Sequence, residues 1–175
     1  MKTKKANKAK KVKAVSNKNI CIIPGTFDPV TNGHLDIILR ASKLFDKIYA
    51  VTFDNSAKKN MFDLHERREM LNLACEGLGK VTVDAANELV TDYAKKKGAG
   101  FIIKGVRNMI DYEWEYNIFR INSEIGDEID TLFIPAKTEH LYISSTFVRE
   151  MIMYGKDISK YVPEKVYDFI NRTKL

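Results

Sequence analysis

Residues 20–34 read ICIIPGTFDPVTNGH and predict a buried strand that turns into the start of a helix. The strand prediction rests on four consecutive apolar residues that end at Pro24 and Gly25. After Gly33, apolar residues recur at helical spacing. We therefore expect a helix whose first turn contains His34.

This predicted strand–turn–helix segment is suited to binding phosphate. The free backbone N–H groups and the positive dipole end of a helix attract anions, and the His34 imidazole adds a donor there. Thr26 supplies a hydroxyl on the facing loop. The segment has neither the Gly-Lys-Ser/Thr ending of a Walker loop nor a Gly-x-Gly-x-x-Gly turn. Those two classes of nucleotide-binding protein are excluded.

The rest of the chain continues the alternation of strands and helices. Short apolar runs predict strands, and capping residues and helical spacing predict the helices between them. Such alternation predicts a single-domain, Rossmann-like α/β fold with a parallel five-stranded sheet, helices on both faces, and ligands at the carboxyl ends of the strands. Beyond residues 20–23, the expected strands are 48–53, 81–83, 101–103 and 132–134, and the later helices are 63–76, 90–97, 109–125, 145–154 and 163–173.

Further polar motifs follow the second, fourth and fifth predicted strands. They are Lys58-Lys59, the segment from Lys104 to Arg107, and the segment 143–146, which reads ISST. Simpler interpretations stay open for each motif. The lysines could be a solvated loop, the two later cations could pair with acidic residues of the next helix, Asp111 and Glu113, and the ISST serines could only cap a helix. Their convergence on one sheet edge favours a binding site.

The charge of the chain is unevenly distributed. The formal net charge is +6, but the first 19 residues hold eight Lys and no acidic residue, which leaves 21 basic and 23 acidic residues for the remainder. Residues 20–175, the predicted domain, are therefore close to neutral, which argues against a dedicated nucleic-acid binder. Residues 1–19 are predicted to be a disordered Lys-rich tail.

The cellular compartment is predicted to be the cytoplasm. The tail lacks the apolar stretch of a secretory signal and the arginines of a mitochondrial transit peptide. No stretch approaches the length of a membrane span. Cys21 lies in a predicted strand and Cys75 in a helical pattern, so both are expected to be reduced core residues.

Taken together, the motifs GTFDP and TNGH, the lysines at 58–59, the KGVR segment and ISST resemble those of bacterial phosphopantetheine adenylyltransferases, within the nucleotidyltransferase superfamily. The resemblance covers residues 20–172. Two positions depart from the family pattern: Lys104 stands where Arg is common, and Thr146 where Ser is frequent. Lys keeps the charge but loses bidentate phosphate geometry.

The resemblance implies a set of site residues. It gives His34, Thr26, Lys58 and Arg107 catalytic roles, with His34 stabilising the transition state. For phosphopantetheine binding it implies Thr26, Lys58, Leu89, Val90 and Lys104. For ATP binding it implies Thr26, Phe27, His34, Gly105, Val106, Arg107, Glu115, His140, Leu141, Tyr142, Ile143, Ser144, Ser145 and Thr146.

It also implies the reaction and the partners. The phosphate of 4′-phosphopantetheine would attack the α-phosphorus of ATP, with Mg²⁺ bound through the ATP phosphates and no protein-built metal site. A homohexamer and feedback inhibition by coenzyme A are further family properties. Nucleic acid is expected to bind only weakly, through the tail. The alternatives are a nicotinate mononucleotide adenylyltransferase, a cytidylyltransferase, and an RNA-associated protein that keeps this fold.

Overall fold

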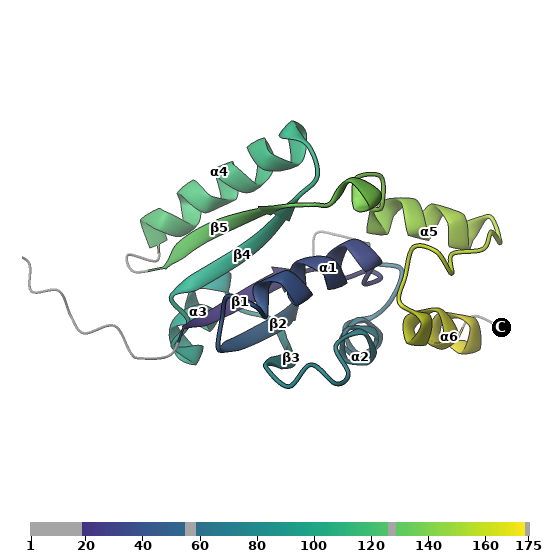
Figure 1. The fold of residues 1–175 in the computed structure, drawn as a ribbon, viewed down its shortest axis with the longest axis horizontal. Coiled ribbons are helices and arrows are strands. Elements are labelled where there is room, and N and C mark those ends of the chain that lie inside the picture. Colours follow the sequence, from purple (N-terminus) through teal and green to yellow (C-terminus); the bar gives the residue numbers. More distant parts are fainter. Residues whose placement is uncertain (1–18, 55–58, 126–128, 174–175) are drawn as a thin grey trace, which may run out of the picture.

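A parallel sheet of five strands forms the centre of the protein (Figure 1). The computed structural model describes residues 19–54, 59–125 and 129–173. The strand order is β3-β2-β1-β4-β5, and every neighbouring pair is parallel. The predicted fold class is confirmed. The strands are β1 (Ile20–Gly25), β2 (Lys47–Phe53), β3 (Val81–Ala86), β4 (Phe101–Val106) and β5 (Asp130–Pro135).

Helices cover both faces of this sheet (Figure 1). One core joins the side chains of Cys21 and Ile23 to α1, α2, α5 and α6, while Ile22, between them, points into a second core with α3. Alternation along β1 thus separates the two faces. The helices are α1 (Asn32–Ala41), α2 (Leu64–Ala74), α3 (Val90–Lys97), α4 (Met109–Ile125), α5 (Ser145–Met153) and α6 (Glu164–Thr173), with a short 3₁₀ turn at Thr138–His140.

Local capping explains why the helix positions were predictable. Asp63 caps α2 and accepts from the backbone N–H of Glu66, whose side chain accepts from the N–H of Asp63 in return. Gly98 ends α3 with φ 66°, which favours glycine. The strands extend beyond the predicted apolar runs, because ladder hydrogen bonds continue through polar positions such as Asp84 and Lys104.

The sheet order places a topological switch point at the carboxyl ends of β1 and β4, and we call this place the crevice. The connections after these neighbouring strands diverge, and in open α/β sheets ligands bind at such a switch point. Helix α1 approaches β4 closely, because a Cβ on Gly105 would lie 3.0 Å from Cγ1 of Ile37. Glycine at this position lets the N-terminal half of α1 sit directly beside the crevice.

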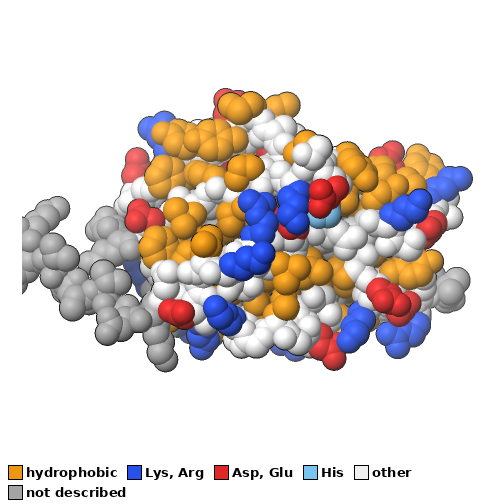
Figure 2. All heavy atoms as spheres, in the orientation of Figure 1, with side chains coloured by type: hydrophobic (Ala, Val, Ile, Leu, Met, Phe, Trp, Pro, Cys, Tyr) orange, Lys and Arg blue, Asp and Glu red, His pale blue; other side chains and the backbone are white. Residues whose placement is uncertain are grey.

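Helix α4 differs from the other long helices because none of its 17 residues is buried. Its exposed apolar side chains belong mostly to one region of the surface, where Figure 2 shows hydrophobic side chains gathered over α4 and β5. The most exposed are Ile110 at 80%, Met109 at 77% and Trp114 at 68%. This helix presents an apolar surface that the described residues leave exposed.

The remaining sequence predictions concern the two cysteines, membrane spans, and residues that the structure does not describe. Cys21 and Cys75 are buried free thiols, as expected, and burial raises the pKa of each to about 12. In the described part of the chain, no helix combines the length and apolar character needed to cross a membrane. Residues 1–18 of the predicted tail (1–19) and Lys58 lie outside the described residues, whereas Asn19 is described and donates to the Leu44 carbonyl.

Candidate functional site

The turn after β1 has a constrained backbone. Phe27 adopts φ 49°, a left-handed conformation that is uncommon for a residue other than glycine. Its ring lies over the backbone of Gly25, where an added Cβ would meet ring carbons at 2.9 Å. Glycine is therefore required at position 25. Such conformations persist only where surrounding contacts impose them.

Asp28 supplies some of those contacts. Its carboxylate is buried and accepts hydrogen bonds from the backbone N–H groups of Met61 and Phe62, both at 2.9 Å. Arg149 of α5 donates to the Asp28 carbonyl at 2.6 Å and lies 3.4 Å from its carboxylate. These contacts hold the turn in place, and within it Asp28 and Pro29 are joined by a cis peptide bond. Arg149 was not among the predicted site residues.

His34 is the third residue of α1 and completes a capping box with Thr31. The backbone N–H of Thr31 donates to Nδ1 of His34 at 3.0 Å, while Thr31 Oγ1 accepts from the His34 N–H at 3.4 Å. Because Nδ1 accepts a hydrogen bond, the proton of the neutral ring is on Nε2. His34 is thus a hydrogen-bond donor through Nε2 at a helix N-terminus.

The ring of His34 stays neutral at physiological pH. Loss of hydration, and then the positive charge of Arg107, lower the pKa of His34 from 6.5 to about 4. The ring also packs edge-on against Phe27, with ring centroids 5.1 Å apart. A neutral donor suits a phosphoryl oxygen without adding a second cation beside Arg107.

Arg107 connects the end of β4 to α4 and to the segment before α5. Its Nε and Nη2 donate to the two carboxylate oxygens of Asp111 at 2.7 and 3.1 Å, and its Nη1 donates to the Ile143 carbonyl at 3.3 Å. The simple pairing considered from the sequence is therefore right for Arg107 and Asp111. It also orients the guanidinium, because a bidentate carboxylate fixes the plane of the group.

Lys104 pairs with a different residue from those considered in the sequence. Its Nζ lies 3.0 Å from Oε2 of Glu115, on the turn of α4 after Asp111, and both side chains are largely buried. The sequence alternative named Asp111 and Glu113, and Glu113 is exposed. A helix places i and i+4 on one side, so Asp111 and Glu115 face the two cations together. Two cations and two carboxylates thus lie along the crevice edge.

The N-terminus of α5 borders the same crevice. Ser144 caps the helix by accepting from the Phe147 N–H at 3.0 Å. Ser145 Oγ donates to the Pro29 carbonyl at 2.8 Å and so ties α5 to the turn after β1. Thr146 Oγ1 accepts from Nη2 of Arg149 at 3.1 Å. The capping interpretation is confirmed, and capping leaves other N–H groups of this terminus free for an anion.

The segment before α5 lies beside the start of α1. The Cβ of His140 is 3.7 Å from the position that a Cβ on Gly33 would occupy. Leu141 and Tyr142 follow and are exposed, at 43% and 64%. Ile143 is buried and holds the carbonyl that Arg107 contacts. Exposed apolar side chains next to a crevice offer a surface for a planar base.

Three predicted residues lie farther along the sheet edge or outside the description. Leu89 and Val90 stand at the start of α3, after β3, which is two strands away from β1. Leu89 is 55% exposed, whereas Val90 packs against the core on the α3 face. Lys58 lies outside the described residues. The described contacts do not join these residues to His34.

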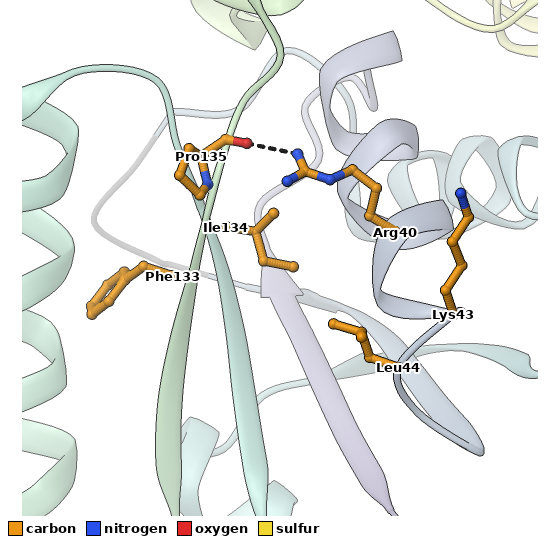
Figure 3. Close-up of a pocket in the computed structure, with 6 residues that line it drawn as sticks. All are labelled: Arg40, Lys43, Leu44, Phe133, Ile134 and Pro135. Atoms are coloured by element: carbon orange, nitrogen blue, oxygen red, sulfur yellow. Dashed lines mark hydrogen bonds between the residues drawn. The ribbon is translucent and has the colours of Figure 1, made fainter.

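A hollow that none of the predicted site residues lines lies elsewhere (Figure 3). Its volume is about 420 Å³, and it opens between the end of α1 and the end of β5. Arg40 spans it by donating to the Pro135 carbonyl at 2.6 Å. The lining residues are Arg40, Lys43, Leu44, Phe133, Ile134 and Pro135.

The geometry of the crevice favours anion chemistry. Its donors are the Nε2–H of His34, the guanidinium of Arg107, the ammonium of Lys104 and two helix N-termini. Nowhere in residues 19–54, 59–125 and 129–173 do three His, Cys, Asp or Glu side chains gather as a metal-binding group would. A polyphosphate could therefore be bound here without side-chain metal ligands.

Sequence reasoning missed two residues that shape this site. Asp111 was considered only as an alternative partner, yet it orients Arg107 through two hydrogen bonds. Arg149 stands three residues after Thr146 on α5, so helical spacing places the two side chains together. That i, i+3 spacing was the available signal. Nothing local indicated that Arg149 reaches Asp28, 121 positions away.

Comparisons with known proteins agree on the family. The cytidylyltransferase-like family profile matches residues 22–151. A phosphopantetheine adenylyltransferase of Nautilia profundicola is 43% identical over 83% of this chain and 94% of its own length. One of Streptococcus pneumoniae is 42% identical over 89% of this chain and 96% of its own length.

A solved structure supports the fold. A Vibrio parahaemolyticus protein, studied as a candidate nicotinate-nucleotide adenylyltransferase, superposes with a TM-score of 0.68. The match covers 89% of this chain and 93% of that one, at 22% sequence identity. At this identity the likeness concerns the arrangement of strands and helices, which is shared across activities.

Proposed function

We infer that this chain, because it belongs to the phosphopantetheine adenylyltransferase family of cytidylyltransferase-like proteins, transfers the adenylyl group of ATP to 4′-phosphopantetheine. The products are dephospho-coenzyme A and pyrophosphate. The observation that carries the proposal is the convergence of His34, Arg107 and the N-terminus of α5 at one crevice. These groups are all donors, as a reaction between two phosphates requires.

The nucleophile needs no general base. A phosphate monoester has its second pKa near about 6, so it is mostly ionised at neutral pH. Catalysis then depends on holding two phosphates in line and on stabilising charge at the α-phosphorus. This requirement agrees with a neutral His34 that donates through Nε2 and does not serve as a proton acceptor.

We assign the remaining roles by position. His34 and Thr26 would contact the α-phosphate, because Thr26 lies on the turn after β1 and His34 lies in the first turn of α1, which follows it. Arg107 and the N-terminus of α5 would bind the β- and γ-phosphates, with Ser144, Ser145 and Thr146 contributing. Lys104, and Lys58 by family resemblance, would bind the acceptor phosphate. Leu89 and Val90 would meet the pantetheine arm.

The adenosine part of ATP would lie along the segment before α5. Phe27, Gly105, Val106 and Glu115 border the crevice from the β1 and β4 sides. Segment 140–143 borders it from the other side and contributes His140, Leu141, Tyr142 and Ile143. Glu115 is held by Lys104 in the ligand-free chain, so nucleotide binding would share or exchange this ion pair.

Mg²⁺ would be held by the ATP phosphates and water. This fits the described residues, which offer donors at the crevice but no cluster of carboxylates or imidazoles for the ion. When bound, the ion would neutralise part of the charge on the departing pyrophosphate. Arg107 would supply the complementary charge from the protein side.

We also propose an oligomer, a hexamer by family resemblance. The apolar surface of α4 supports it, because contiguous exposed apolar patches mark sites of association. Coenzyme A would inhibit the enzyme, since it carries the pantetheine arm and adenine nucleotide of the product. We place the reaction in the cytoplasm, where the two buried free thiols would stay reduced.

The decisive experiment measures pyrophosphate release from ATP with and without 4′-phosphopantetheine. Nicotinate mononucleotide as acceptor and CTP as donor are the matched controls. We expect release only with ATP and 4′-phosphopantetheine together. Pyrophosphate release that depends on nicotinate mononucleotide would favour the nicotinate mononucleotide adenylyltransferase. Release that occurs with CTP and not with ATP would favour the cytidylyltransferase. No turnover together with salt-sensitive RNA binding would favour the RNA-associated protein.

A further inference from the structure

Arg67 of α2 is the largest fully buried side chain in the described part of the protein, and it is charged. It is only 1% exposed. A buried charge is costly unless it is paired and hydrogen-bonded. Arg67 Nη2 lies 2.9 Å from Oδ1 of Asp54, which balances the charge. The guanidinium is therefore kept in the core by specific partners.

The other partners of Arg67 are backbone carbonyls from three separate segments. Nη1 donates to Thr26 at 2.9 Å and to Phe53 at 3.3 Å, and Nε donates to Phe62 at 3.2 Å. Thr26 follows β1, Phe53 ends β2 and Phe62 precedes α2. One rigid fork thus joins the carboxyl ends of two adjacent strands to the start of the next helix.

The contact with Thr26 acts on the turn that borders the crevice. In a trans peptide the C=O and the following N–H point in opposite directions. Because the Thr26 carbonyl points at Arg67, the N–H of Phe27 points away from it. The same peptide unit leads into the left-handed backbone of Phe27, whose ring contacts His34. Arg67 therefore sets the orientation of a peptide directly beside His34.

Asp28 also belongs to this turn, but its carboxylate makes different contacts from those of Arg67. Its carboxylate accepts from the N–H groups of Met61 and Phe62, whereas Arg67 donates to the carbonyl of Phe62. The Asp28 carboxylate therefore binds N–H groups of the segment before α2, and the Arg67 guanidinium binds a carbonyl of the same segment. Arg67, from the first turn of α2, donates to the Thr26 carbonyl as well and so joins this segment to the turn after β1.

We propose that Arg67 is a positioning residue for adenylyl transfer. By binding the Thr26 carbonyl, Arg67 orients the N–H of Phe27. It also holds the Thr26 hydroxyl in position to contact the phosphate that reacts beside His34. The proposal rests on the proposed function, because it requires that the reacting phosphate meet this turn. Arg67 itself does not touch substrate.

The test compares Arg67→Lys with Arg68→Lys, the same change at the exposed neighbouring position of α2. Lysine keeps the charge and the Asp54 pair but cannot reach all four acceptors as a planar fork does. We expect kcat to fall at least tenfold in Arg67→Lys, with the ATP Kd within about threefold of wild type. Arg68→Lys is expected to keep wild-type kcat.

A purely structural role for Arg67 predicts a different result. Arg67→Lys would then lower Tm, while kcat per folded molecule stayed at the wild-type value, and that result would overturn the proposal. Arg67→Met removes the donor to three backbone carbonyls and is less suitable, because the variant can fail to fold. Asp54→Asn is a second variant, which keeps an acceptor for Nη2 and so is expected to retain most of kcat.

The outcome can be separated from failure of the proposed function. Wild-type turnover with 4′-phosphopantetheine tests the function alone. The amide resonance of Phe27 reports the peptide orientation without turnover, and we expect it to move in Arg67→Lys but not in Arg68→Lys. An unmoved Phe27 resonance would overturn the positioning role even in an inactive wild-type chain.

Discussion

The turn after β1 and helix α4 both border the crevice, but they differ in how far their side chains are buried. In the turn, Phe27, Asp28, Val30 and Thr31 are at most 3% exposed, and charged groups from α2 and α5 hold the backbone. In α4 no residue is buried, and large apolar side chains face solvent. The described residues supply the contacts that hold the turn, whereas they leave the apolar side chains of α4 exposed.

The two regions meet through a pair of cations. Arg107 is held by Asp111 and Lys104 by Glu115, both carboxylates on α4. Arg107 also acts on His34, whose pKa it helps to lower. The turn is thus held by α2 and α5, while the positions of Arg107 and Lys104 depend on where α4 lies. Mutations can separate these two contributions.

The largest effect is expected at the turn. His34→Ala should lower kcat by about two to three orders of magnitude, the scale for losing one transition-state donor. Steady-state pyrophosphate release measures it. His65→Ala, at an exposed position of α2, is the matched control and should keep wild-type turnover. Wild-type kcat in His34→Ala would remove this residue from the mechanism.

A large effect on assembly, with a smaller one on folding, is expected at α4. Ile110 and Trp114 are 80% and 68% exposed and lie four residues apart on one side of the helix. The double change Ile110→Glu, Trp114→Glu should convert the oligomer to smaller species in sedimentation velocity while the far-ultraviolet spectrum stays unchanged. His65→Glu controls for added surface charge. An unchanged sedimentation coefficient would exclude α4 from the interface.

The pH dependence of stability offers a third comparison. His34 has a folded pKa of about 4, against 6.5 as its ordinary value. As pH falls below about 6.5 the unfolded chain takes up a proton that the folded chain does not, so this group lowers stability progressively down to about pH 4. The slope is at most about 1.4 kcal/mol per pH unit.

His34→Asn removes that titration while Oδ1 can still accept from the Thr31 N–H. Denaturant unfolding of both proteins between pH 7 and pH 4 measures the difference. We expect the stability of the variant relative to wild type to increase as the pH falls. A constant difference across this window would mean that His34 titrates normally in the folded chain.

A modest effect is expected where the two regions meet. Lys104→Arg restores the residue that the family commonly has, and kcat should stay within about tenfold of wild type, or roughly 1.4 kcal/mol. The KM for 4′-phosphopantetheine should change more than the KM for ATP. A collapse of activity would show that the space between β4 and Glu115 is fitted to lysine.

The smallest effect is expected from the tail. Deleting residues 1–17 should leave kcat, both KM values and Tm nearly unchanged, because the tail offers few side chains able to dock on the domain. Full-length protein should bind RNA weakly at low salt, and the binding should disappear with added salt or with the deletion. Loss of activity on truncation would show that the tail is part of the enzyme.

Local signals predicted the elements well. The Asp63–Glu66 box and the end of α3 at Gly98 follow from residues close in sequence, because capping is a short-range interaction. The edge of the sheet that carries the crevice was predictable for a similar reason. In a parallel α/β fold, every loop after a strand leaves from the same edge.

The sequence by itself therefore determined the fold class, the helix starts and the edge at which the donors gather. Tertiary structure alone decided which donors are paired and how they are held. Lys104 selects Glu115, Arg149 reaches Asp28 across the fold, and the buried Arg67 holds Thr26. Patterns of a few residues encode local geometry, but a charged side chain selects its partner by distance after the chain has folded.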